Sequence, residues 1–240
     1  MSLLRRLFGG KTTAKEYPTD EININGKSLR LRFFAHASVA IEYENRWIYV
    51  DPVMENADYS TLPKADVILV THHHFDHFDM AAIEALQKED TRLLLDKTSA
   101  EGLGGDCYTM LPKGVAEPIE GIKVEAVAAY NTSEGHTDFH PKHREDCGYV
   151  LTLGEAVRIY ISGDTELTEE MKALQGIDIA FISVNQPYTM TPQQAVEAVK
   201  ALQPKIFYPY HYGQVDEPTD VEALARMLQD IVDVRIRPLA

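Results

Sequence analysis

The sequence has few cysteines, few basic residues and no long hydrophobic run, and each shortage excludes a class of protein. Two cysteines, Cys107 and Cys147, occur in 240 residues, so we exclude a disulfide scaffold and predict a cytoplasmic protein. No apolar stretch is long enough to span a membrane. The 23 lysines and arginines against 37 aspartates and glutamates give a formal net charge of -14, which argues against a nucleic-acid partner and against an anionic membrane surface.

Length and composition favour a single catalytic domain. A chain of 240 residues that is 45% hydrophobic is long enough to bury a large α/β core. No internal repeat or linker divides it. We predict one domain over residues 21–240, preceded by a flexible N-terminal tail over residues 1–20. A homo-oligomer is compatible with these features, and the sequence does not decide between oligomeric states.

The order of strand-like and helix-like segments predicts the fold class. Strand-like runs are grouped as hairpins in the first half of the chain and alternate with helical patterns in the second. The predicted strands cover residues 29–34, 39–43, 47–50, 67–70, 93–95, 124–129, 149–153, 157–161, 179–184 and 206–208. The predicted helices cover residues 80–87, 191–202 and 221–231. This mixture indicates an α/β fold with two sheets and outer helices, a four-layer αβ/βα sandwich.

The most informative motif lies directly after the strand-like run at residues 67–70. Five residues that can bind a metal ion, four histidines and one aspartate, fall within six consecutive positions there. His72 and His74 are two apart, so an extended segment points them the same way, and Asp76 and His77 follow where the chain turns towards the same point. Imidazole and carboxylate ligands suit zinc, manganese or iron. We interpret the motif as a metal site for two ions.

Other polar residues occupy similar places along the chain. Asp51, Asp164 and His211 each follow an apolar strand-like run, in the contexts Val-Asp-Pro, Ser-Gly-Asp-Thr and Pro-Tyr-His-Tyr. His36 stands earlier, in Ala-His-Ala-Ser. In this order, and with His-x-His-x-Asp-His at residues 72–77, the motifs resemble the metallo-β-lactamase fold superfamily. The segment Ala129-Tyr130-Asn131, followed by Phe139-His140-Pro141-Lys142, resembles a subgroup of predicted metal-dependent hydrolases in this superfamily, related to ascorbate-phosphate lactonase and N-acyl-phosphatidylethanolamine phospholipase.

The resemblance implies a role for each matching side chain. One metal ion would be bound by His72, His74 and one further histidine. The second ion would be bound by Asp76, His77 and His211, with Asp164 bridging both ions. Asp76 would also orient the nucleophile.

One position departs from the family pattern. Family members usually carry the further histidine at the end of the strand before Gly-Asp-Thr, where this chain has Asn131. We predict His140 as the displaced ligand, with His136 as the alternative. If both are ordinary surface residues, Asn131 leaves one ion weakly held or absent.

Three residues are candidates for supporting roles. Asp51 is placed to accept a hydrogen bond from a ligand imidazole and so fix its tautomer. His36 either lines the cleft and donates to the substrate, or it shapes a turn. Tyr188 either stabilises a developing oxyanion with its hydroxyl group, or it packs with that group in water.

The ligand set predicts the chemistry. Divalent ions lower the pKa of a coordinated water and polarise a substrate oxygen. We therefore predict a metal-dependent hydrolase with two divalent ions, with zinc ahead of manganese or iron. Its substrate would be a small anionic molecule with an ester-like bond, either a phosphodiester or a lactone. The alternative is a non-catalytic metal-binding sensor or interaction protein of the same fold, which Asn131 supports and the complete set of other ligands opposes.

Overall fold

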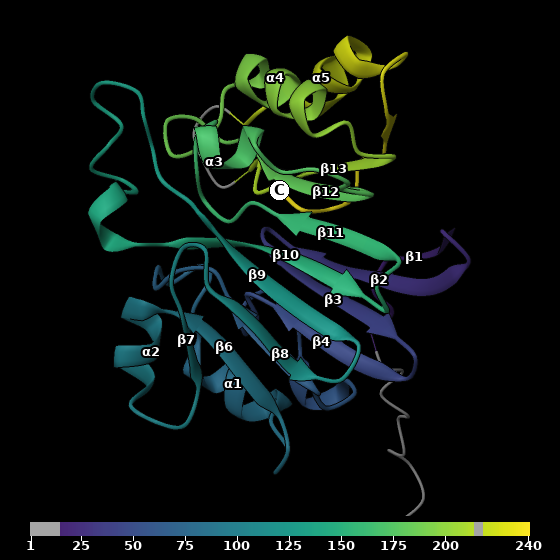
Figure 1. Cartoon of the computed structure of the whole chain (residues 1–240), viewed down its shortest axis with the longest axis vertical. Coiled ribbons are helices and arrows are strands. Elements are labelled where there is room, and N and C mark those ends of the chain that lie inside the picture. Colours follow the sequence, from purple (N-terminus) through teal and green to yellow (C-terminus); the bar gives the residue numbers. More distant parts are fainter. Residues whose placement is uncertain (1–14, 214–217) are drawn as a thin grey trace, which may run out of the picture.

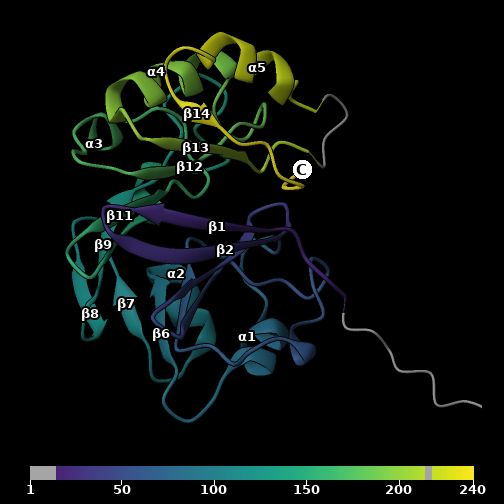
Figure 2. The ribbon, with the colours of Figure 1, turned by 90° about the vertical axis from the view of Figure 1, so that its right-hand side faces the viewer.

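The computed structural model describes residues 15–213 and 218–240. Within these ranges two seven-stranded sheets lie face to face, with helices on the outer face of each sheet (Figures 1 and 2). The first half of the chain forms one sheet and the second half forms the other. This arrangement confirms the predicted four-layer αβ/βα sandwich.

Strands that follow one another along the chain are also neighbours in each sheet. The first sheet contains β1 (Thr19–Ile24), β2 (Lys27–Ala35), β3 (Ser38–Tyr43), β4 (Arg46–Val50), β5 (Val67–Val70), β6 (Arg92–Asp96) and β7 (Tyr108–Met110). The second contains β8 (Val115–Ile119), β9 (Ile122–Ala128), β10 (Cys147–Leu153), β11 (Val157–Ile161), β12 (Ile179–Ser183), β13 (Ile206–Tyr210) and β14 (Asp233–Val234). Pairing is antiparallel from β1 to β4 and from β8 to β11, and it is parallel in the rest of each sheet.

The helices start where the sequence supplies caps. The first sheet is covered by α1 (Met80–Leu86) and α2 (Lys97–Leu103), and the second by α3 (Glu169–Lys172), α4 (Pro192–Leu202) and α5 (Val221–Leu228). Two short 3-10 turns, η1 (Tyr59–Thr61) and η2 (Lys142–Arg144), lie in loops. The Thr191 side chain accepts from the backbone N–H of Gln194, and the Gln194 side chain accepts in return from the Thr191 N–H. This capping box, with Pro192 at the first helical position, fixes the start of α4.

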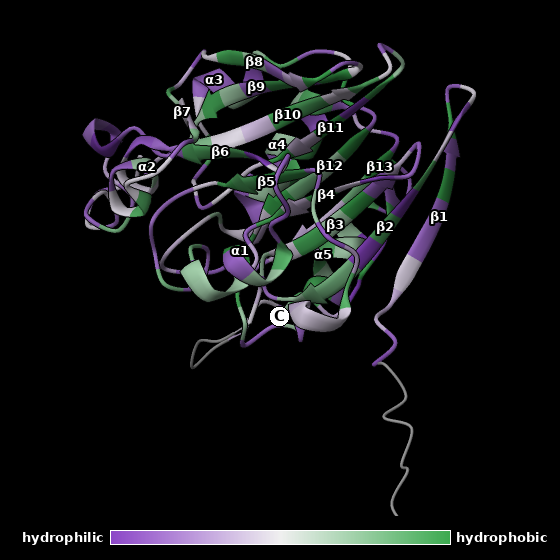
Figure 3. Cartoon of the chain, turned by 90° about the horizontal axis from the view of Figure 1, so that it is seen from below, coloured by the Kyte–Doolittle hydropathy of each residue, from purple (hydrophilic) through white to green (hydrophobic). Residues whose placement is uncertain are grey.

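Three hydrophobic layers hold the four structural layers together. The middle layer fills the space between the sheets, and the outer two lie between each sheet and its helices. In β5, Val67 and Leu69 face the other sheet, whereas Ile68 and Val70 face the helices. A strand buried on both faces needs this uninterrupted apolar run, and each such side chain contributes roughly 1.5–3 kcal/mol by burial. In Figure 3 the inner strands are mostly hydrophobic, whereas much of β1 at one edge is hydrophilic.

The predicted strands and helices all have counterparts in the structure, and the additional elements are short or polar. The structure adds β1, β7, β8, β14, α2 and α3. The end of the predicted tail is a strand, because β1 begins at Thr19 and Asp20 forms an ion pair with Arg237 at 2.7 Å. The sequence of this edge strand is polar, so it lacks the apolar run from which the other strands were predicted. Residues 1–14 of the tail lie outside the described residues.

Both cysteines are free. Cys147 is buried in β10, whereas Cys107 is partly exposed just before β7. Among the residues that the structure describes, no helix is both long and apolar enough to cross a membrane.

The cap of α2 makes stability depend on pH. Burial raises the pKa of Asp96 to about 6, although its carboxylate accepts from the backbone N–H groups of Thr98 and Ser99. The folded protein therefore holds this proton more tightly than the unfolded chain, whose aspartates titrate near about 4. The stability that the group contributes is present at lower pH and is lost as the pH rises through about 6.

We expect Asp96→Asn, which keeps a capping oxygen, to raise the free energy of unfolding at pH 8 by about 2 kcal/mol, with almost no gain at pH 4. Urea denaturation of both proteins at the two pH values measures this difference. An equal gain at both would contradict the assignment to the Asp96 proton.

Candidate metal centre

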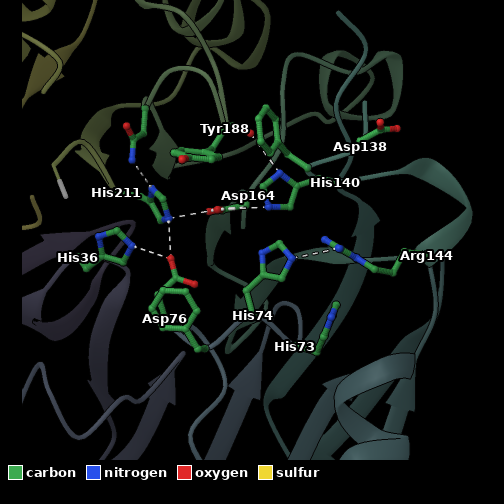
Figure 4. A pocket seen from close by; sticks show the side chains of 13 residues that line it. His36, His73, His74, Asp76, Asp138, His140, Arg144, Asp164, Tyr188 and His211 are labelled. Carbon is green, nitrogen blue, oxygen red and sulfur yellow. Dashed lines mark hydrogen bonds and ion pairs between the residues drawn. The ribbon is translucent and has the colours of Figure 1, made fainter. Parts of the chain in front are cut away.

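The loops at the carboxyl ends of strands from both sheets enclose one cavity of about 630 Å³. The segment 72–77 follows β5, Asp164 follows β11 and His211 follows β13. β11 and β13 run parallel within the second sheet and β5 lies in the first, and residues that follow all three strands line the same cavity, as expected at the carboxyl ends of strands in α/β sheets. Figure 4 shows their side chains converging on the cavity.

A first group of imidazoles consists of His72, His74 and His140. His72 Nε2 lies 3.1 Å from His74 Nδ1, and one nitrogen of each ring lies within 4.8 Å of the other two. His140 reaches them because the loop after β9 folds back. The backbone N–H of Asn131 donates to the carbonyl of His140 at 2.8 Å. The loop thus places His140 beside Asn131, close to the end of β9.

A second group surrounds the carboxylate of Asp76. Its Oδ2 atom lies 3.1 Å from His36 Nε2, 3.5 Å from His211 Nε2 and 3.8 Å from His77 Nε2. The four residues each offer a ligand atom within 4.8 Å of the others. The predicted members Asp76, His77 and His211 are therefore close together, and His36 is the fourth member of this group.

Asp164 lies between the two groups. Its Oδ2 atom is 3.1 Å from His211 Nε2, 3.5 Å from His140 Nε2 and 4.0 Å from His72 Nε2. Its Oδ1 atom is 3.4 Å from His77 Nε2. The side chain is 3% exposed, so this carboxylate faces imidazoles of both groups and almost no solvent.

Hydrogen bonds at the outer nitrogens aim the rings inward. His77 Nδ1 donates to Asp51 Oδ2 at 2.8 Å. His72 Nδ1 lies 3.1 Å from Thr71 Oγ1, which itself donates to Asp51 Oδ2 at 2.7 Å. Asp51 thus orients the His77 ring directly and the His72 ring through Thr71. The Nε2 atoms of both rings then face the centre of the site. His140 is oriented in the same way, because its Nδ1 donates to a backbone carbonyl.

The polar atoms at the centre fit a metal ion. Nε2 of His77, Nε2 of His140 and Oδ1 of Asp164 are buried without a hydrogen-bond partner. Such atoms cost folding free energy unless a partner is supplied. A divalent cation is the partner that imidazole nitrogens and a carboxylate oxygen share, and this donor set suits zinc, manganese or iron.

Two imidazoles of the first group are held neutral. Burial lowers the pKa of His72 well below its usual range. Burial and the neighbouring Arg144 charge lower the pKa of His74 to about 4. Neutral imidazoles keep the lone pair that a metal ion requires.

The rings next to the carboxylates behave differently. Burial opposes a charge on His211, but Asp164 raises its pKa to about 9. Burial opposes a charge on His77 as well, yet Asp164 and Asp51 raise its pKa well above the usual range. A metal ion could take the place of the protons that these two rings hold beside the buried carboxylates. Its binding would then release those protons.

The two alternatives to His140 lie outside both groups. Asn131 donates from its amide to the backbone carbonyls of His136, at 3.1 Å, and Tyr188, at 2.7 Å. His136 lies 3.3 Å from Glu166, and among the described residues it belongs to none of the potential metal clusters. Asn131 therefore braces the loop, and His136 contacts Glu166 rather than either ligand group.

Tyr188 lines the cavity with its ring, which packs edge-on against Phe139 at a centroid distance of 4.8 Å. Its backbone carbonyl accepts from His140 Nδ1 at 3.1 Å. Two further residues of the site, Asn185 and Arg144, were not predicted. The amide group of Asn185 contacts His211 Nδ1 at 3.2 Å, and its place two residues after β12 was the available signal. Arg144 lies on a loop and follows no motif.

Comparison with known proteins agrees with this geometry. Residues 30–211 match the Beta-lactamase superfamily domain. The chain belongs to the β-lactamase superfamily. The predicted superfamily is thereby confirmed, whereas the closer relationship to the lactonase and phospholipase branch stays a prediction.

Relatives within the superfamily cover nearly the whole chain. The crystal structure of a predicted metal-dependent hydrolase from Parabacteroides distasonis ATCC 8503 is 46% identical, covers 94% of this chain and 100% of that one, and superposes with a TM-score of 0.88. A metal-dependent hydrolase of Methanosphaera stadtmanae is 31% identical over 84% of this chain and 92% of its own. Igni18, a metallo hydrolase from Ignicoccus hospitalis, shares the fold with a TM-score of 0.72 at 21% identity, over 88% of this chain and 96% of that one. The family is thus one of metal-dependent hydrolases.

Proposed function

We propose that the chain is a hydrolase that depends on two divalent metal ions and cleaves an ester-like bond in a small anionic substrate. The observation that carries this proposal is the pair of ligand groups with Asp164 between them. One group alone would suit a structural or mononuclear site. Two groups joined by a buried carboxylate match the arrangement that two-metal hydrolases use.

In the proposed assignment each group holds one ion. His72, His74 and His140 would bind the first, and Asp76, His77 and His211 would bind the second, with Asp164 shared. Zinc is our first choice, and manganese and iron are the alternatives, because histidine and carboxylate ligands accept all three. When bound, such ions lower the pKa of water and polarise an oxygen of the scissile bond.

The protein itself holds Asp76 ready as an acceptor. Burial opposes its ionisation, but hydrogen bonds from His211 and His36 hold its pKa well below the usual range. Burial lowers the pKa of His36, so this ring is neutral and can donate its Nε2–H to Asp76 at 3.1 Å. A carboxylate that stays ionised is suited to orienting a water by accepting its hydrogen. His36 would then act by fixing that carboxylate.

The cavity suits a small molecule with an apolar part. Its volume of about 630 Å³ lies within the usual range for small-molecule sites. Phe75, which is 83% exposed, lines it together with Phe139 and Tyr188. These rings can cover a substrate and exclude water around the bond that is cleaved. A phosphodiester and a lactone are the two bond types that we propose.

Hydrolysis of chromogenic substrates tests the proposal. The zinc-loaded, metal-stripped and reloaded protein would be assayed with bis(4-nitrophenyl) phosphate and with a lactone such as dihydrocoumarin. We expect turnover only with metal, and a fall of at least about a hundredfold in His74→Ala. His143→Ala is the matched control, because His143 is exposed on the loop that carries His140 and belongs to neither group.

Metal binding without turnover on any ester would favour the alternative, a non-catalytic metal-binding sensor or interaction protein. That alternative rested on Asn131. The position of His140 beside His72 and His74 argues against it.

A further inference from the structure

Arg144 presents one nitrogen of its guanidinium group, Nη1, to the cavity. Its side chain is 16% exposed. Its Nε donates to both carboxylate oxygens of Asp146 at 2.8 Å, and its Nη2 also donates to Asp146. Asp146 is 1% exposed, so the ion pair fixes the plane of the guanidinium group. Nη1 remains, and it lies 3.0 Å from Nε2 of His74 (Figure 4).

This contact conflicts with the proposed role of His74 as a ligand. Nδ1 is the nitrogen of His74 that lies within the first group, 3.1 Å from His72 Nε2. If Nδ1 gives its lone pair to a metal ion, the one hydrogen of the neutral ring must sit on Nε2. Arginine has donors only. Two N–H groups would then face each other, and both would need an acceptor.

We propose that Arg144 Nη1 and His74 Nε2 together receive an anionic oxygen of the substrate, either of a phosphate or of a carboxylate. This inference rests on the proposed function, because it takes His74 as a metal ligand, and it names the group that the substrate carries beside the scissile bond. An anionic oxygen has the lone pairs that both N–H groups lack, and hydrogen bonds from a charged donor are the stronger kind.

The charges of the lining side chains favour an anion beside Arg144. Among the described residues that line it, Arg144 is the only arginine or lysine, whereas Asp76, Asp138 and Asp164 are acidic. The pairing with Asp146 keeps the guanidinium from turning towards those carboxylates. The planar fork also gives Nη1 a fixed position, which a flexible lysine would not have. Phe139, which also lines the cavity, offers an apolar surface for the rest of the substrate.

Binding of an anion that is not turned over tests the inference. Inorganic phosphate would be titrated into the zinc-loaded protein by isothermal titration calorimetry, and malonate would be titrated in a second series. We expect Arg144→Gln to weaken binding of the preferred anion by about tenfold to a hundredfold, with zinc content per chain unchanged. Arg144→Lys keeps a charge beside the buried Asp146, so it protects the fold while removing the fork, and we expect it to weaken binding as well.

Lys142→Gln is the matched control. It removes one positive charge two residues away, from a side chain that is 64% exposed and paired with Glu170, and we expect it to bind the anion as the unaltered protein does. The anion that shows the dependence on Arg144 identifies the substrate group as phosphate or carboxylate. Failure of both anions to bind, or equal affinity in the Arg144 variants, overturns the inference. So does loss of zinc in those variants, because Arg144 would then merely position His74.

These readouts do not require turnover. Absence of ester hydrolysis together with binding that depends on Arg144 would therefore count against the proposed hydrolase function and leave the anion site standing. Hydrolysis of esters together with anion binding that does not depend on Arg144 would support the proposed hydrolase function and overturn the anion site.

Discussion

Replacing Asp164 with asparagine is expected to lower the rate of metal-dependent hydrolysis by about a thousandfold or more. Asp164 is buried between the two ligand groups, within 3.1–4.0 Å of four imidazole nitrogens. An asparagine of the same shape keeps the packing but removes the charge that both ions would share. The effect should therefore appear in kcat, with fewer metal ions bound per chain and the fold retained. Steady-state kinetics and elemental analysis measure the two effects.

Asp138→Asn provides the comparison. Asp138 also lines the cavity, but it is exposed and stands apart from the imidazoles (Figure 4). This variant removes the same charge and should change the rate by less than about threefold. Similar losses in both variants would show that the net charge of the cavity matters and that Asp164 has no special role between the ions.

The second large effect concerns metal content. We expect the unaltered protein to bind two zinc ions per chain, and His140→Ala to bind one. His140 is 1% exposed, its ring is aimed by the carbonyl of Tyr188, and its Nε2 atom has no hydrogen-bond partner. Removal of this nitrogen leaves only His72 and His74, with part of Asp164, for the first ion. The other group is untouched and should keep its ion. Elemental analysis of protein purified without a tag gives the ratio.

His136→Ala is the control from the same loop. His136 is 30% exposed at its side chain and contacts Glu166, so two ions should remain. A ratio of one or less in the unaltered protein, unchanged by His140→Ala, would make Asn131 a true loss of a ligand. The balance would then move to a mononuclear site or to a protein without turnover.

The sequence predicted the elements and ligands that follow a strict local pattern. Runs such as Val67–Val70 are apolar because both faces are buried, and this pattern is visible without knowledge of the fold. The residues that follow such runs could be predicted to meet, since parallel strands end together. Asp51, Asp164 and His211 each follow such a run, and the resemblance to the superfamily supplied the ligand roles of Asp164 and His211.

The remaining parts of the site depend on loop geometry, which leaves no periodic signal. His140 comes near the strand end only because the loop closes through the hydrogen bond from the Asn131 backbone. Arg144 is aimed at His74 by a buried partner, Asp146, and nothing in the spacing of these residues reveals that contact. His36 has a positive φ of 52°, so its direction follows from a tight turn that composition does not predict.

The separation of the two sheets along the chain has a consequence for biosynthesis. The first sheet is finished at Met110, before the second begins at Val115, so all its strands can pair while the rest is still being translated. Its inner face has no cover at that stage, and the nascent half carries the histidines of residues 72–77 without Asp164 or His211. Both ligand groups are therefore complete only after the second half of the chain has been made, because His140 and His211 lie in it.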